Sequence, residues 1–251
     1  MLLQNRNAIV YGGGGSIGGA MAAAFAREGA TVHLVGRTAA TLERTAERIR
    51  AAGGKAETAV LDALDEAAVD AHADSVAATA GSVDISVNVI SHGDVQGTPL
   101  ARMSLEDFER PVRTAVRTMF LTTRAAARHM IRQGSGVILV FGGHGDPPRG
   151  YHLGGLQVAF GAQEYLRRNL AAELGPHGVR VVTLQTAGVP ESMPTDFGAA
   201  REVTESIVGQ TMLNRAATLA DVGNVAAFVA SDQAAAITGS AVNITCGTAV
   251  G

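Results

Sequence analysis

Four consecutive glycines, residues 12–15, are the first feature of this chain that could do chemistry. They stand between a short apolar run at residues 8–11, typical of a buried parallel strand, and a helical pattern that begins at Ser16. Glycine accepts backbone angles that other residues avoid, so the chain can turn tightly here. A strand, a glycine turn and a helix start aim free backbone N–H groups at a phosphate. We expect phosphate binding, rather than a merely structural turn, at Gly12, Gly14, Gly15, Ser16, Ile17 and Gly18.

A second group of reactive side chains lies in residues 142–152, which follow a later apolar run. This segment contains His144, Tyr151 and His152. Imidazole titrates near neutrality and can act as acid or base, although each of these groups could equally be a solvated loop residue. A metal site is imaginable, but the spacing matches no recognised ligand pattern, so we expect none from the candidate set of His92, His144, Asp146 and His152.

These groups need a scaffold, and apolar runs alternate with amphipathic runs from end to end. The expected strands are residues 8–11, 31–36, 56–61, 83–89, 136–141, 179–184 and 241–244. The expected helices are residues 16–28, 39–52, 66–80, 105–133, 153–174, 201–212 and 219–231. The alternation predicts an α/β fold, a single-domain Rossmann-type doubly wound parallel sheet over residues 1–251 with helices on both faces.

Three irregular segments, each following a strand, should wall the ligand crevice at the carboxyl ends of the strands: residues 91–99, 142–150 and 186–198. Ser104 and Asp107 resemble a capping box for the long helix at residues 105–133. Pro111 lies inside that helix pattern, so it should kink the helix or delay its start.

Composition limits the class of protein and its partners. The net charge is −3 with no long basic run, so we expect neither nucleic acid nor an anionic membrane as a partner. Cys246 is the single cysteine, so the chain forms no internal disulfide. The first strand begins within a few residues of Met1, which leaves no room for a signal peptide, and no apolar stretch is long enough to span a bilayer. We therefore expect a cytoplasmic protein.

At this point the chain resembles the short-chain dehydrogenase/reductase family over nearly all its length. The shared motifs are Gly12-x-x-x-Ser16-x-Gly18, with Ser16 where a second glycine is usual, Phe25-Ala-Arg-Glu-Gly-Ala30, Leu61-Asp62, the segment from Leu170 to Val181, Arg215, Asp221-Val222, Ser231-Asp232 and Thr238-Gly239. Several motifs in the right order are far more specific than one glycine turn. The resemblance implies a nicotinamide cofactor, with further contacts from Asp62, Ala63, Asn88, Gly188 and Ser192.

The end of the second expected strand bears on the choice of cofactor. An NAD site has an acidic residue here that binds the ribose hydroxyls, but the chain continues as Arg37-Thr38, and its next acid is Glu43. Arg37 offers a guanidinium suited to a 2′-phosphate, although it could also be a solvated loop residue. We therefore expect NADP(H), with Arg37 and Thr38 at the site.

The family's catalytic Tyr, Lys, Ser and Asn are absent from the matching positions. The resemblance places Leu156 at the Tyr position, Phe160 at the Lys position, Gly143 at the Ser position and Ala115 at the Asn position. The chain has a single lysine, Lys55, between the second expected helix and the third expected strand, where we expect it to lie far from the nicotinamide. The usual Tyr–Lys couple therefore cannot form.

Two classes of function remain open. The first is an NADP(H)-dependent oxidoreductase that acts on a carbonyl or enoyl group of a small molecule, with His144, Tyr151 or His152 as an atypical proton donor. The second is a fold that has lost redox chemistry, either a dehydratase, isomerase or cyclase or a nucleotide-binding module. The family resemblance favours the first class. The helices at residues 105–133 and 153–174 resemble those that pair between subunits, which predicts a homotetramer.

Overall fold

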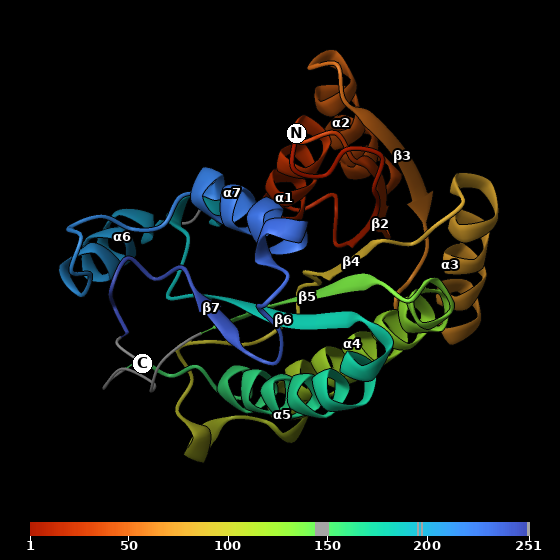
Figure 1. Ribbon diagram of the computed structural model, residues 1–251. Coiled ribbons are helices and arrows are strands. Elements are labelled where there is room, and N and C mark those ends of the chain that lie inside the picture. The colour runs from red at the N-terminus through yellow and green to blue at the C-terminus, as the bar shows by residue number, and fades with distance from the viewer. Residues whose placement is uncertain (144–150, 195, 197, 250–251) are drawn as a thin grey trace.

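A computed structural model describes residues 1–143, 151–194, 196 and 198–249. The strands are β1 (Asn7–Tyr11), β2 (Thr31–Gly36), β3 (Lys55–Val60), β4 (Ile85–Asn88), β5 (Gly136–Gly143), β6 (Val179–Thr186) and β7 (Ala241–Asn243). Within these residues they form one seven-stranded sheet in the order β3-β2-β1-β4-β5-β6-β7, with every pairing parallel (Figure 1). The order reverses between β1 and β4, which confirms the doubly wound fold.

Helices cover both faces of the sheet (Figure 1). They are α1 (Ser16–Arg27), α2 (Ala39–Ala51), α3 (Glu66–Ala80), α4 (Leu105–Gln133), α5 (Leu156–Leu174), α6 (Ala200–Gly209) and α7 (Leu219–Ala230). Side chains of α1, α2 and α7 share one buried cluster with the strands, and side chains of α3, α4 and α5 share another. Successive strand residues point to opposite faces, so a short apolar run such as β1 supplies both clusters.

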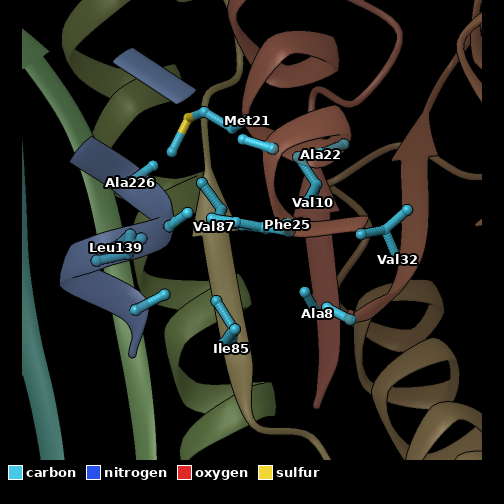
Figure 2. Close-up of a cluster of buried hydrophobic side chains, with 14 of the residues drawn as sticks. Ala8, Val10, Met21, Ala22, Phe25, Val32, Ile85, Val87, Leu139 and Ala226 are labelled. Atoms are coloured by element: carbon cyan, nitrogen blue, oxygen red, sulfur yellow. The ribbon is translucent and has the colours of Figure 1, made fainter. Parts of the chain in front are cut away.

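The first of these clusters lies at the centre of the molecule. Figure 2 shows Val10 of β1 and Val87 of β4 beside Met21 and Phe25 of α1, with Ala226 of α7 close by. Met21 and Phe25 are fully buried. This packing fixes α1 against the sheet, so its first turn lies directly after the glycines that follow β1.

The long helix begins at Leu105, so Pro111 does not delay its start. The Ser104 side chain accepts a hydrogen bond from the Asp107 N–H at 3.1 Å, which anchors the first turn ahead of the proline. The Asp107 carboxylate accepts from the Ser104 hydroxyl at 2.7 Å. The expected N-cap is therefore present. The reciprocal bond differs from that of a capping box, because the Asp107 carboxylate accepts from the Ser104 hydroxyl and not from the Ser104 backbone N–H.

Helix α5 begins at Leu156, three residues later than the pattern at residues 153–174 predicts. Gly154 has φ +57°, outside the helical range, and a Cβ at Gly155 would overlap the carbonyl oxygen of Phe108 in α4. The close approach of α4 therefore sets where α5 begins. In the described residues, no helix is both long and apolar enough to cross a membrane.

Candidate active site

The glycine turn after β1 is shaped by close backbone contacts. Gly12 has φ +90°, and a Cβ there would stand 2.6 Å from the carbonyl oxygen of Val89, just after β4. A Cβ at Gly18 would overlap the carbonyl oxygen of Gly12, and one at Gly14 would stand 2.5 Å from Oγ1 of Thr41 in α2. Side chains are therefore excluded from both sides of the turn, which keeps the backbone in reach of a ligand.

Helix α1 starts without a cap. Its N-cap residue is Gly15, no side chain bonds to the first turn, and no acidic residue stands in that turn. Gly15 and Ser16 are exposed. The first N–H groups of a helix have no partner inside it and carry the positive end of the helix dipole, so this end suits an anion. Side chains of Asp65, Ser104 and Thr218 cap α3, α4 and α7, whereas α2 and α5 also begin without a side-chain cap or an acidic residue, so the preceding glycine turn is what distinguishes α1.

The ends of β2 and β3 provide the next predicted groups. Arg37 and Thr38 are exposed, and Arg37 makes no hydrogen bond or ion pair within the described part of the chain. Asp62 is exposed just past β3, and its Oδ1 accepts from the N–H of Leu64 at 3.0 Å. Ala63 is buried. These residues lie at the same edge of the sheet as the glycine turn, because parallel strands end together.

Two of the predicted cofactor side chains are already used by the protein itself. Asn88 is buried at the end of β4, where its Nδ2 donates to Thr122 Oγ1 at 3.2 Å and its Oδ1 accepts from the Ile90 N–H at 3.2 Å. The Ser192 hydroxyl donates to the carbonyl oxygen of Val189 at 2.7 Å. Gly188 adopts φ +120° after β6, and a Cβ there would stand 2.8 Å from Cδ1 of Ile207 in α6.

The predicted proton donors lie before α5. His144 lies outside the described residues. Tyr151 and His152 are exposed, and the His152 carbonyl oxygen accepts from the Gly97 N–H at 2.8 Å, which joins this segment to the loop after β4. Of the other tyrosines, Tyr11 is buried in β1 and Tyr165 is 71% exposed on α5. Among the described residues, no three His, Cys, Asp or Glu side chains gather where they could hold a metal.

An aromatic pair, formed by His92 in the loop after β4 and Phe160 of α5, is the contact that the sequence did not reveal. His92 is 8% exposed, and its ring meets the Phe160 ring edge to face with 5.9 Å between centroids. Burial lowers the pKa of His92, against an opposing effect of Asp94, so the imidazole is neutral near pH 7. Phe160 also covers Gly143 at the end of β5. The sequence showed only that a glycine and a phenylalanine stand at positions 143 and 160, where the family has Ser and Lys.

Lys55 is exposed at the first residue of β3. The crevice lies at the other end of the strands, about 17 Å away along a six-residue strand. The only lysine of the chain is therefore excluded from the crevice, in agreement with the sequence analysis.

Comparison with known proteins agrees with this architecture. The sequence profile described as enoyl-(acyl carrier protein) reductase matches residues 13–249. A probable galactose dehydrogenase of Rhizobium meliloti (strain 1021) is 31% identical over 247 residues, covering 96% of this chain and 94% of its own. A short-chain type dehydrogenase/reductase from Mycobacterium marinum superposes with a TM-score of 0.88 at 26% identity, covering 99% of this chain and 97% of its own.

A gluconate 5-dehydrogenase from Burkholderia cenocepacia J2315, solved in complex with NADP and tartrate, superposes with a TM-score of 0.86 at 25% identity. The alignment covers 99% of this chain and 97% of that one. The match of the profile over nearly all residues and the relative above 30% identity lead to one conclusion: the chain belongs to the short-chain dehydrogenase/reductase family of oxidoreductases.

Proposed function

We propose that this protein is an NADP(H)-dependent oxidoreductase that acts on a carbonyl or enoyl group of a small molecule. The observation that carries the proposal is the uncapped, acid-free start of α1 above the glycine turn, with Arg37 exposed at the end of the neighbouring strand. A dinucleotide pyrophosphate fits the first feature and a 2′-phosphate fits the second. The Burkholderia relative, solved with NADP, supports the same choice.

Each group has a role in this proposal. The backbone N–H groups of residues 16–18 would bind the pyrophosphate, and Arg37 with Thr38 would bind the 2′-phosphate. Asp62 and Ala63 would border the adenine, whereas Asn88 and Ser192 would contribute through backbone, since their side chains are engaged within the protein. When bound, NADPH supplies a hydride.

The proton needed for reduction would come from the segment before α5. His144, Tyr151 and His152 are the candidates, and an imidazole needs no lysine to titrate near pH 7. Tyr151 lies five residues before Leu156, the family's tyrosine position. A hydroxyl there would lack the lysine that the family pairs with its tyrosine, because Lys55 stands at the opposite end of the strands.

That same position of Lys55 favours the second candidate function, a non-redox enzyme or nucleotide-binding module on this fold. NADPH oxidation measured over a panel of ketones, aldehydes and enones at several pH values separates the two. Oxidation of NADPH with any of these classes supports the oxidoreductase. Tight NADPH binding by calorimetry without turnover on the whole panel would favour the second function instead. In either case we propose a small-molecule ligand and a cytoplasmic site of action.

A further inference from the structure

Phe160 stands between two strand ends. Its ring lies edge to face against His92, which follows β4, and it also lies against Gly143, the last residue of β5. In a doubly wound sheet the dinucleotide crosses the crevice at these carboxyl ends, with one half on each side of the reversal in strand order. The glycine turn and Arg37 belong to β1 and β2, so Phe160 belongs to the other half.

The space around Phe160 shows that it and Gly143 fit each other. A Cβ built on Gly143 would overlap Cε2 of the ring and stand 2.7 Å from Cδ2. A serine at position 143 would therefore displace the ring. A Cβ built on Gly142 would stand 3.9 Å from Phe160 Cδ1, which is an ordinary van der Waals distance. The absence of a side chain at position 143 therefore makes room for the large side chain at position 160.

Asp94 is the charged group that acts on His92. Two other positions at which the family carries polar catalytic side chains are apolar here. Ala115 of α4 is fully buried and presents only a methyl group, and Leu156 is half-buried at the start of α5. Neither ring nitrogen of His92 bonds to another residue in the described part of the chain, and the burial that keeps the imidazole neutral leaves it one donor and one acceptor. The rings of His92 and Phe160 would therefore suit a flat ligand ring that is uncharged or weakly polar and carries an amide group at its edge.

We propose that Phe160, seated on Gly143, and His92 form an aromatic wall that positions the nicotinamide end of the dinucleotide by ring packing. The wall takes the place of the ionic contact with the nicotinamide ribose that the family resemblance assigns to the Lys absent from position 160. This inference rests on the proposed function, because it presumes a nicotinamide dinucleotide. Both rings are positioning residues and neither carries the proton.

Two ligands test the wall by calorimetry: NADPH, and 2′-phospho-ADP-ribose, which has the adenine half without nicotinamide. In the native protein NADPH should bind about tenfold or more tightly than the fragment. Phe160→Ala and His92→Ala should each weaken NADPH by about tenfold and leave the fragment within about twofold. Gly175→Ala, just past the end of α5, is the matched control, since a Cβ there meets nothing within 4 Å.

The pairing of Gly143 with Phe160 provides a second, independent readout. Gly143→Ser should weaken NADPH in the native background and have little effect in Phe160→Ala, where the ring is gone. Additive effects of Gly143→Ser and Phe160→Ala on NADPH affinity would contradict the aromatic wall and leave the proposed function intact. Equal losses of affinity for NADPH and for the fragment would do the same. If neither ligand binds the native protein, the proposed function falls and the wall with it.

Discussion

Gly12 must be glycine because of its positive φ and its close contact with backbone, and Gly18 because of close contact with backbone alone. A Cβ at Gly18 would overlap the Gly12 carbonyl oxygen, and neither group is the flexible end of a side chain. We therefore expect Gly18→Ala to displace the turn and weaken NADPH by about a hundredfold, measured by calorimetry. Gly175→Ala, where a Cβ meets nothing within 4 Å, is the control. Equal affinities for NADPH in the two variants would contradict a phosphate site at this turn.

Arg37 carries the prediction on cofactor choice. It is exposed and has no partner among the described residues, so its guanidinium is available to a 2′-phosphate. NADPH should bind more tightly than NADH, and Arg37→Asp should level or reverse that preference by about tenfold or more. Arg201→Asp on α6 changes the same charge far along the chain and should leave the preference as it was. Equal native affinities for both cofactors would disprove the prediction.

The proton donor gives a prediction with a pH profile. If His144 is the donor, reduction should decline as pH rises through about 6.5, and His144→Ala should lower turnover by about a hundredfold with NADPH affinity nearly unchanged. A phenol donor would instead give a flat profile across neutrality, because free phenols titrate well above pH 7. Loss of activity in Tyr151→Phe with a silent His144→Ala would transfer the role to Tyr151.

Residue-level reasoning from the sequence succeeds where one residue type has one geometric use. The tight contacts at Gly12, Gly14 and Gly18 agree with the predicted turn, because glycines between a strand and a helix have few other reasons to cluster. The pairing of Gly143 with Phe160 could not be predicted. It depends on how β5 and α5 approach in space, and neither local pattern contains that distance.

Between the sheet and α3, a buried polar cluster makes stability depend on pH. Tyr11 Oη, His33 Nε2 and His72 Nδ1 are buried without hydrogen-bond partners among the described residues. Burial, helped by the nearby His33, lowers the pKa of His72 to about 4, and burial lowers that of His33 against the opposing effect of Glu57. The folded protein thus holds both imidazoles in their neutral form at pH 7.

The sign of the effect follows from the lowered pKa values. Between pH 6.5 and about 4 the unfolded chain binds a proton at His72 that the folded chain does not, so stability falls as pH falls through this window. The His72 share is about 3 kcal/mol. Urea unfolding at pH 7, 5 and 4 should show the loss, and His72→Leu should reduce it. His177→Gln, a change at an exposed histidine, should not. An unchanged pH slope in His72→Leu would contradict this account.

The elements themselves were largely predictable from periodicity. The expected β2, α3 and α4 have the same bounds in the structure, and most other ends differ by one or two residues. Helix α6 ends at Gly209, three residues before the predicted end at residue 212. Two other differences have tertiary or capping causes. Helix α5 starts late because Gly155 lies against the Phe108 carbonyl oxygen, and Pro111 leaves the start of α4 intact because Ser104 caps it first. Such contacts join segments far apart in sequence, so local patterns do not contain them.

At the scale of the whole molecule, α4 carries charged and apolar side chains next to each other, and the Arg124 guanidinium lies over the Phe120 ring, 5.6 Å from its centroid. Toward α3, Arg124 and Arg128 pair with Glu66, Asp70 and Asp74. Elsewhere on α4, Val116, Phe120 and Ile131 are 36%, 48% and 39% exposed, at spacings that place them on one stripe. Large apolar side chains at such spacing on a surface helix are typical of an interface.

The neighbouring helix α5 continues this surface and gives the last prediction. Val158 and Tyr165 are 48% and 71% exposed, and a Cβ at Gly161 between them meets nothing within 4 Å. A second copy could therefore approach α5 closely, and self-association by two-fold axes would give a homotetramer. Light scattering at about micromolar concentration should give a tetrameric mass, and Tyr165→Glu should shift it toward smaller species, because the change removes the large apolar ring that stacks under Arg168 and places a carboxylate in the interface. Val60→Glu, at an exposed valine on β3 at the sheet edge, is the control. A monomeric native mass, or a tetramer unmoved by Tyr165→Glu, would show that copies of the chain do not meet through this face.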